Sequence, residues 1–388
     1  MNDLRKVIEK SLHKLEKWVE DRNYKAYDPF DGLNSILRPL TFNNEFAERL
    51  LEQIVRQSPL NLRPLIGIKP DMSTKGIGFM AWGYINMFKC VGGQEYKGKA
   101  LRLLDWLDVN KAAGYRHHSW GNHFDWTSRS GRQPKGEPDI VWTGLIGQTF
   151  LDAYELFKET RHLEVVKSIN EWMKGLSKER TEKGTCLSYL ASSDSFIHNS
   201  NMVGAGYLAR SSIFSGDISA LKIAEDSVEY TCSRQLSDGS WFYGEEPNKH
   251  WIDNFHTAYN LDSLKCYINV TGDKTFEQNL RKGFIYWKDH FFEETGRPKY
   301  YSNRTYPVDS QCASQAIDTL TNFSDRDGQA LELACKVADW TIKNMQDKDG
   351  HFYYRQYPLG IKAKAPMLHW AQATMYKALT HLMLKMTK

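Results

Sequence analysis

The amino-acid sequence predicts an all-α protein, an (α/α)6 toroid in which six inner and six outer helices form a closed ring. Two observations predict it. Apolar helices rich in small residues recur along the chain at nearly regular intervals, and helices with a single apolar stripe alternate with them. A regular period of this kind is typical of repeat architectures. A ring is favoured over an open superhelix of helical hairpins because the repeats carry no polar cap for an exposed end.

The expected inner helices are apolar on nearly all faces. The segment from Thr143 to Lys158 shows the pattern, with Ile146, Phe150 and Leu151 among its apolar residues. A helix that is apolar all round is expected to be buried. The expected starts of the six inner helices lie near Gly76, Thr143, Asn201, Thr257, Ser310 and Trp370.

The expected outer helices have one charged face and an aromatic residue near the end. The turns into two of them are close copies, Phe-Ser-Gly-Asp ending at Asp217 and Val-Thr-Gly-Asp ending at Asp273. Such short connections imply that the helices they join are antiparallel neighbours. The aromatic residues of the six outer helices are Trp18, Trp106, Trp172, Tyr230, Trp287 and Trp340.

The whole chain, residues 1–388, is predicted to form one toroid domain. Its opening segment, Leu4 to Val19, has the apolar stripe of an amphipathic helix and supplies one outer helix. A further helix, expected over residues 44–57, does not fit the period. We therefore interpret it as an insertion in the first repeat.

The composition excludes several classes of protein. A hydrophobic content of 41% suffices for a large core, and the net charge of +4 comes without a basic block, which argues against a nucleic-acid partner. The charged N-terminal segment and the lack of a long uncharged apolar run predict neither a signal peptide nor a membrane span. The six scattered cysteines indicate reduced thiols rather than a disulfide framework. Together these features predict a cytoplasmic protein.

The connections that lead from outer back to inner helices are long, and in a ring they all emerge at the same end. Eight of the 12 histidines fall in these loops. Long loops inside a compact fold are usually functional, so this end is the expected active face. The loops cover roughly residues 109–142, 177–200, 235–256, 291–309 and 346–369.

The first long loop alternates aromatic rings with polar groups, a pattern that suits stacking and hydrogen bonding to a sugar ring. The alternative is that the aromatic residues fasten the loop to the rim and meet no ligand. The residues predicted to bind substrate here are His123, Asp125, Trp126, Arg129 and Arg132.

The loop that ends at His256 leads into an inner helix, so Asp253 and His256 are expected to lie near its N-terminus and to face the ring. A helix N-terminus lowers the pKa of a histidine and leaves its imidazole free to act as a base. Aromatic Tyr243 and Trp251 precede these residues and are predicted to contact substrate. The alternative for Asp253 is simple N-capping, and for His256 the filling of a gap.

Polar residues also stand at the starts of other inner helices, and we expect these starts to converge on one pocket. Asn201 begins the third inner helix, Asp309 the fifth, and His369 and Trp370 the sixth. Asn201, His369 and Trp370 are predicted substrate-binding residues.

Two chemistries remain open for this pocket. Asp253 and Asp309, from neighbouring repeats, could act as the carboxylate pair of a glycoside hydrolase. In the other, His256 is the base and Tyr306 the acid of a proton abstraction, with Arg129 or Arg132 holding the carboxylate of a uronate. The sequence does not choose between them.

The sequence predicts no metal and no cofactor. His117, His118 and His123 lack the i, i+4 spacing by which two histidines on one helix face share a zinc ion.

Two heptads, Gln235 to Trp241 and Gln346 to Phe352, resemble the Q-x-x-D-G-x-W motif of terpene-cyclase-type toroids. In that family the motif is structural. The acidic D-x-D-D motif of the cyclases and the Asp/Cys/His zinc set of the prenyltransferases are absent from this sequence, so isoprenoid chemistry is disfavoured.

Three further segments resemble patterns of the VpsJ-like proteins of bacterial surface-polysaccharide clusters. They are Tyr27 to Asn34, Trp251 to Thr257 and Met367 to Ala373, and the similarity extends over most of the chain. More distantly, Trp251 to Leu261 together with Asp273 to Trp287 is similar to part of the helical domain of glucuronyl C5-epimerases, whose catalytic tyrosines have no match here.

These resemblances imply a carbohydrate-active toroid in surface-polysaccharide biosynthesis. It would act on a polysaccharide or its precursor by uronate epimerisation, elimination or glycosidic cleavage, with a polysaccharide or oligosaccharide as ligand and other polysaccharide-synthesis proteins as possible partners. The alternative is a non-catalytic glycan-binding or scaffold subunit of a synthesis complex.

Overall fold

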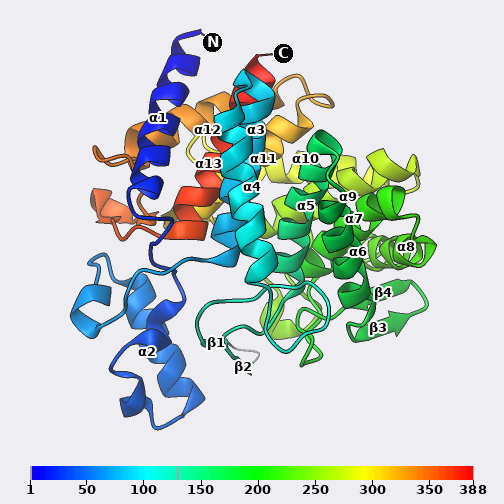
Figure 1. The fold of residues 1–388 in the computed structure, drawn as a ribbon, viewed down its shortest axis with the longest axis horizontal. Coiled ribbons are helices and arrows are strands. Elements are labelled where there is room, and N and C mark those ends of the chain that lie inside the picture. The colour runs from blue at the N-terminus through cyan, green and yellow to red at the C-terminus, as the bar shows by residue number, and fades with distance from the viewer. Residues whose placement is uncertain (1, 129–130, 388) are drawn as a thin grey trace.

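A computed structural model describes residues 2–128 and 131–387 and confirms the all-α (α/α)6 toroid (Figure 1). Each inner helix packs against the next along the chain, and the last packs against the first, so the ring closes. The predicted starts lie close to the observed ones. The inner helices are α3 (Thr74–Val91), α5 (Ile140–Phe157), α7 (His198–Ser215), α9 (Asn254–Thr271), α11 (Ser310–Phe323) and α13 (Thr374–Met386), which the π-helical turn η6 (Leu368–Ala373) precedes.

The outer helices surround this ring, and their apolar stripes face it. Trp287 of the fourth repeat is fully buried, and its indole nitrogen donates to the carbonyl of Asn254 at 3.1 Å. The aromatic residue of that outer helix thus fixes the start of an inner one. The outer helices are α1 (Asn2–Glu20), α4 (Gln94–Val109), α6 (Thr160–Lys174), α8 (Ile218–Cys232), α10 (Glu277–His290) and α12 (Ala330–Met345).

Short strands brace the long loops at one end of the ring. Two hairpins and one three-stranded sheet of order β5-β6-β7 are formed, all antiparallel. The short helix η4 (Pro247–Lys249) lies in the third loop and η5 (Pro358–Gly360) in the fifth. The strands are β1 (Trp126–Ser128), β2 (Gly131–Gln133), β3 (Lys178–Thr181), β4 (Gly184–Leu187), β5 (Val308–Asp309), β6 (Arg355–Gln356) and β7 (Lys362–Ala363).

The two heptads form equivalent turns that tie one outer helix to the next. Gln235 Nε2 donates to the carbonyl of Gly239 at 2.8 Å, and Gln346 Nε2 does the same to Gly350 at 2.8 Å. Both glycines have a positive φ and approach the backbone of the neighbouring outer helix so closely that a Cβ would lie within 2.6 Å of a carbonyl oxygen. Glycine is required there because both the conformation and the space exclude a side chain.

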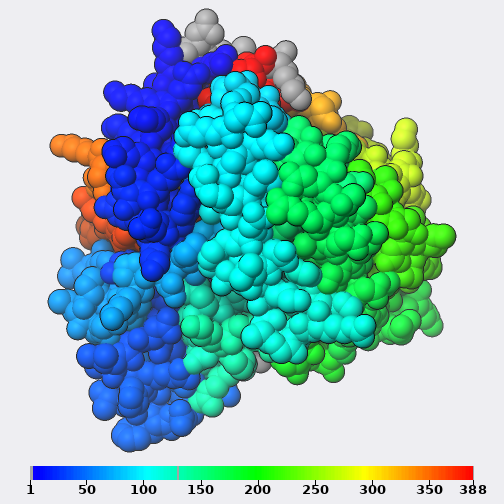
Figure 2. Space-filling view, viewed as in Figure 1, coloured from blue at the N-terminus to red at the C-terminus, as the bar shows by residue number. Residues whose placement is uncertain are grey.

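The chain between α1 and α3 forms a lobe, residues 31–66, that protrudes from the ring (Figures 1 and 2). It contains α2 (Glu45–Gln57), where the inserted helix was expected. The lobe docks on the first long loop, because Thr127 Oγ1 and Arg132 Nε bind Glu48 at 2.8 and 2.7 Å. The short helices of the lobe are η1 (Asp31–Asn34), η2 (Arg38–Thr41) and η3 (Arg63–Ile66).

Within the described residues, no helix is long and apolar enough to cross a membrane. All six cysteines are free, and Cys186, Cys232 and Cys312 are buried. The apolar core is continuous around the ring.

Candidate functional site

His256 and Asp253 form a dyad at the start of α9. Asp253 is the N-cap of this helix: its Oδ1 accepts from the backbone N–H of His256 at 3.0 Å, while its Oδ2 lies 2.7 Å from His256 Nδ1. The carboxylate is buried, whereas the imidazole is 22% exposed. Since Nδ1 faces the carboxylate, the second nitrogen, Nε2, is free to exchange a proton, and it has no hydrogen-bond partner among the described residues.

A small recess, with a volume of about 10 Å3, lies beside His256. Tyr243 and Trp251 form its aromatic wall; their rings stack with centroids 4.4 Å apart, and the Tyr243 ring lies 4.7 Å from that of His256. Burial holds the pKa of the Tyr243 hydroxyl above its usual range. The indole nitrogen of Trp251 donates to Asp253 Oδ2 at 3.1 Å, so one carboxylate orients both the imidazole and the wall.

Two buried amides complete the recess. The Oδ1 atoms of Asn199 and Asn260 are buried and have no partner among the described residues, and both residues line the recess with His256. Next to them, Gln311 donates to the Tyr259 hydroxyl at 3.0 Å, and its Oε1 also lacks a partner in the described part of the chain. An unsatisfied buried amide costs about 1–3 kcal/mol. Water or a hydroxyl-rich ligand would satisfy these acceptors.

Lys75, at the start of α3, lies near helix α9, which carries His256, because its ammonium group faces the ring of Tyr259. Its side chain is buried, and Nζ makes no hydrogen bond or ion pair with any described residue. Three rings surround it, with Nζ 5.6 Å from the centroids of Phe79 and Trp142 and 5.8 Å from that of Tyr259. Burial lowers the pKa of Lys75 to about 8, opposed by the charge of nearby Asp139.

A second dyad stands at the start of the sixth inner helix. His369 Nδ1 lies 2.5 Å from Asp28 Oδ2, and both side chains are almost fully buried. The His369 ring is 5.0 Å from Trp142, which also contacts Lys75. Burial holds the pKa of His369 below its usual range. This imidazole is therefore neutral near pH 7 and able to accept a proton.

Asp309, like Asp253, caps an inner helix, but its carboxylate is fully buried and has no contact with solvent. Its Oδ1 accepts from the backbone of Gln311 at 2.9 Å and from the indole nitrogen of Trp370 at 2.7 Å, and its Oδ2 accepts from Arg355 Nε at 2.6 Å. Both the carboxylate and the guanidinium are buried. Asp253 and Asp309 thus have all their oxygens engaged within the protein, which does not suit a pair of carboxylates that act on a glycosidic bond.

Tyr306 lies in its own loop, away from the dyads. Its hydroxyl accepts from Arg297 at 3.3 Å, and Arg297 is in turn paired with Glu293 at 2.5 Å. Among the described residues no hydrogen bond or ring contact joins Tyr306 to His256. The structure therefore does not bring the expected base and acid together.

The first long loop holds the lobe rather than an open groove. Asp125 pairs with Arg38, and Trp126 lies 5.1 Å from the ring of Phe30. Arg132, paired with Glu48, is likewise held by the lobe. Residue 129, the other arginine predicted to hold a carboxylate, lies outside the described residues.

His123 is half-buried and Asn201 is fully buried. Burial lowers the pKa of His123, and its Nδ1 has no partner among the described residues. Asn201 is fully engaged: it accepts from the backbone of Leu187 at 2.9 Å and donates to Ser227 and Thr231. Its side chain holds the third inner helix against its outer neighbour and has no free group for a ligand.

Three residues of this region were not predicted: Lys75, Asp28 and Asn260. Lys75 does stand at the start of an inner helix, so its position was a usable signal. Asp28 lies in a segment quoted for its family pattern, Tyr27 to Asn34, but nothing in the sequence paired it with His369. Asn260 lies one turn after His256 on the same helix face, as the helical period would place it.

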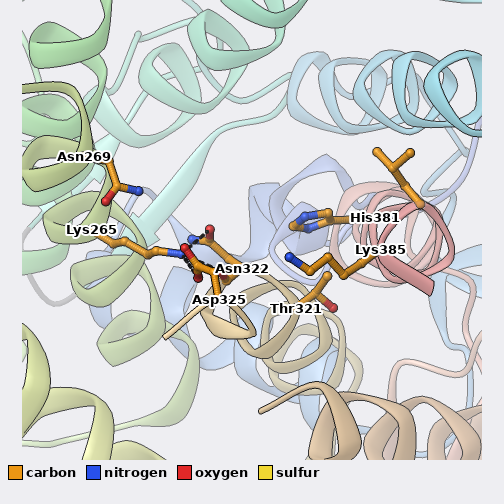
Figure 3. A pocket seen from close by; sticks show the side chains of 8 residues that line it. Lys265, Asn269, Thr321, Asn322, Asp325, His381 and Lys385 are labelled. Atoms are coloured by element: carbon orange, nitrogen blue, oxygen red, sulfur yellow. Dashed lines mark hydrogen bonds and ion pairs between the residues drawn. The ribbon is translucent and has the colours of Figure 1, made fainter. Parts of the chain in front are cut away.

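A larger cavity, of about 270 Å3, opens at the other end of the ring (Figure 3). Two of the basic side chains that line it are engaged by the protein: Lys265 binds Asp325 at 2.5 Å, and His381 Nδ1 lies 2.8 Å from Asp318 Oδ1. No polar side-chain atom that lines it is buried without a partner in the described part of the chain. It lies away from the long loops, so we do not assign the function to it. Over the residues described, no three His, Cys, Asp or Glu side chains gather where they could hold a metal ion.

No protein-family model and no curated protein matches this sequence. Solved structures match its fold. The cellobiose 2-epimerase of Bacillus thermoamylovorans has a TM-score of 0.63 at 10% identity, over 81% of this chain and 88% of that chain. An α-mannanase of family GH76 from Bacteroides thetaiotaomicron has a TM-score of 0.63 at 12% identity, over 81% and 87%.

The matching structures are toroids of enzymes that act on sugars. An inactive variant of the α-1,6-mannanase of Salegentibacter, in complex with α-1,6-mannotriose, also matches, with a TM-score of 0.59 at 13% identity over 82% of this chain and 91% of that chain. The structural neighbours thus include both epimerases and glycoside hydrolases. At such identities the likeness establishes the fold alone, and VpsJ-like membership remains a prediction.

Proposed function

We propose that this toroid is a sugar-modifying enzyme in which His256 moves a proton at a carbon atom next to a carbonyl group, as in an epimerisation, isomerisation or elimination. The observation that carries the proposal is the His256–Asp253 dyad, with one imidazole nitrogen fixed by a buried carboxylate and the other free at the recess. A histidine held in this way is the usual proton-transfer group near neutral pH.

Proton transfer is favoured over glycosidic cleavage by the state of the carboxylates. Glycoside hydrolysis needs two carboxyl groups that face the scissile bond, whereas Asp253 and Asp309 are both engaged by caps, indoles and a basic group. His369, neutral beside Asp28, is the second group able to take or return a proton.

The surroundings suit a sugar. Stacked Tyr243 and Trp251 offer a flat apolar face, and the free oxygens of Asn199 and Asn260 accept hydrogen bonds from hydroxyl groups. With a volume of about 10 Å3, the recess is far smaller than a typical ligand pocket, whose volume starts at about 300 Å3. We therefore infer that the loop carrying Tyr243 shifts outward when a sugar enters. Epimerases and an isomerase of sugars among the structural neighbours support this chemistry.

Deuterium exchange tests the proposal. The protein is incubated in deuterated water with cellobiose, mannose and uronic-acid oligosaccharides, and NMR follows deuterium at carbons next to the carbonyl group and the appearance of new sugars. We expect exchange with at least one sugar and its loss in His256→Gln.

The matched control for this experiment is His290→Gln. His290 lies on the outer helix α10 and hydrogen-bonds its own helix at 2.8 Å, so its replacement should leave exchange unchanged. If no sugar exchanges while the fluorescence of the protein responds to sugar, the binding function replaces the catalytic one. The surface-polysaccharide context and a cytoplasmic location belong to the same proposal and are tested by where the gene product acts in cells.

A further inference from the structure

The lobe exposes an unusual amount of apolar surface. Elsewhere in the described chain, exposed large apolar side chains occur singly or in pairs, as is normal for a soluble surface. In the lobe they are concentrated in one short stretch of chain, and the lobe protrudes from the ring (Figure 2). The exposed side chains are Ile36, Leu37, Leu40, Phe42, Phe46, Leu50, Ile54, Leu60 and Leu65.

Helix α2 turns its apolar stripe away from the protein. Phe46, Leu50 and Ile54, at successive i, i+4 positions, form one ridge and are 69%, 51% and 53% exposed. The inner face carries Glu48 and Glu52, both fully buried, and binds the first long loop through polar contacts. A surface helix normally buries its apolar stripe. The ridge is therefore not used by this chain's own fold.

We propose that this face of the lobe, the α2 ridge with the adjoining short helices, is the interface of a homodimer. The exposed fractions of the nine side chains correspond to on the order of 1,000 Å2, with about 150–250 Å2 for a fully exposed large side chain. A standard stable interface buries about 800 Å2 per partner. The summed apolar area of the lobe is therefore of the size that a second copy would need.

The ridge also has a geometry that fits its own copy. Residues at i, i+4 spacing form the ridges that interdigitate in the commonest class of helix pairs. About a twofold axis, two antiparallel α2 helices would place Leu50 near the axis, with Phe46 of one protomer facing Ile54 of the partner subunit. The ridge itself carries no charge, so no like charges are forced together.

The cations of the lobe do not favour a lipid surface instead. An anionic membrane surface is bound by free Lys and Arg side chains beside the apolar face. Here Arg38 pairs with Asp125, Arg63 with Asp31 at 2.7 Å, and Arg56 with the Tyr354 hydroxyl at 3.1 Å. Only Arg49 of the four arginines in this segment has no such partner among the described residues.

Light scattering coupled to size exclusion tests the proposal over a wide range of protein concentration. We expect the wild type to approach twice the chain mass of 44.9 kDa. Leu50→Lys places two like charges at the twofold axis and should weaken the dimer at least tenfold while leaving the circular dichroism spectrum and Tm unchanged. Ile213→Lys, at a helical site that is 57% exposed on the ring, is the matched control and should remain dimeric.

Phe46→Ser provides a second variant at the edge of the ridge, for the case in which Leu50→Lys does not fold. Oxidation of Leu50→Cys should add a crosslinked dimer that the six native cysteines do not form. A wild type that stays monomeric at every concentration overturns the proposal, and so does a dimer that Leu50→Lys and Phe46→Ser leave intact. Monomeric binding to phosphatidylcholine vesicles that Leu50→Lys abolishes also overturns it and assigns the face to lipid.

Discussion

The N-termini of the neighbouring inner helices α9 and α11 have the same design with one difference. Each begins with an aspartate N-cap, Asp253 or Asp309, whose carboxylate also accepts from an indole nitrogen, that of Trp251 or Trp370. The third partner differs: an imidazole at α9 and a guanidinium at α11.

The difference decides what each N-terminus can do. The guanidinium of Arg355 is always charged and is 4% exposed, so the α11 N-terminus holds a sealed, permanent ion pair. The imidazole of His256 can both accept and donate a proton and is 22% exposed, so the α9 N-terminus can exchange a proton with a ligand. Equal backbone roles therefore do not imply equal functions; the third partner separates a proton-transferring site from a structural one.

The largest effect is expected from His256→Gln, which should lower turnover. Removal of a positioned proton-transfer group typically lowers turnover by about 10²–10⁴-fold. The imidazole is partly exposed, so the fold should persist. Deuterium exchange of the responsive sugar measures the loss, and circular dichroism checks the fold. Turnover within about twofold of the wild type would remove His256 from the mechanism.

Arg355→Met tests the sealed ion pair at α11. It leaves the carboxylate of Asp309 buried without its cation, which should lower the free energy of unfolding by about 3–5 kcal/mol. Denaturant titration measures the change. The double variant Arg355→Met/Asp309→Leu should recover most of the lost stability, because it removes the uncompensated charge. A single variant as stable as the wild type would contradict the structural role of this pair.

Asp253→Asn sharpens the contrast at the α9 N-terminus. Asparagine caps a helix about as well as aspartate, so Tm should change little. His256 loses its carboxylate, however, and turnover should fall by about 10–100-fold, the loss typical when a carboxylate that orients a metal-bound histidine is removed. Asp309→Asn should show the reverse: a large loss of stability, because Arg355 is left buried without its anion. Equal losses of Tm in the two variants would erase the distinction.

Lys75→Met gives the smallest effect and links the α9 and α11 regions, because Tyr259, which contacts Lys75, hydrogen-bonds Gln311. The folded pKa of about 8 lies below the ordinary value of 10.5, so the native state binds fewer protons than the unfolded state between these values. The stability of the wild type should therefore rise with pH from about 8 to about 10.

The variant should lose this rise and should be more stable at pH 7 by about 1–3 kcal/mol, since a buried charge is replaced by an apolar side chain. Its affinity for the responsive sugar should fall. Thermal unfolding as a function of pH and titration of tryptophan fluorescence with sugar measure the two effects. A pH profile identical to that of the wild type would show that Lys75 is not held as a buried cation.

The fold was predictable because its signals are local. All-round apolar helices and the copied turns at Asp217 and Asp273 repeat in the sequence itself, and the approximate starts of the inner helices follow from them. The N-terminus of α9 was predictable for the same reason, because Asp253 and His256 are close in sequence and meet within one helical turn.

The rest depends on residues far apart in the chain. In the lobe, Arg38 pairs with Asp125 and Glu48 pairs with Arg132, so these two loop residues bind the lobe and do not line a groove. No local sequence pattern predicts these pairs. Lys75 becomes a buried cation because it packs against the rings of Trp142 and Tyr259, which belong to two other inner helices. Sequence periodicity places a residue on a face, but only the closed ring shows which faces meet.

The ring is closed by segments from opposite ends of the chain. Trp18 of α1 donates to Asp349 at 2.9 Å, Gln346 donates to the carbonyl of Ser11 at 3.2 Å, and α3 packs against α13. During synthesis Asp349 emerges 331 residues after Trp18, so the contacts of α1 stay unformed until these distant partners have been made. Contacts so distant in sequence slow folding. In a circular permutant opened at the turn of Gly216 and Asp217, with the native ends joined by a linker, α1 would follow α13 closely along the chain. The contacts that close the ring would then join residues near in sequence, and the permutant should fold faster.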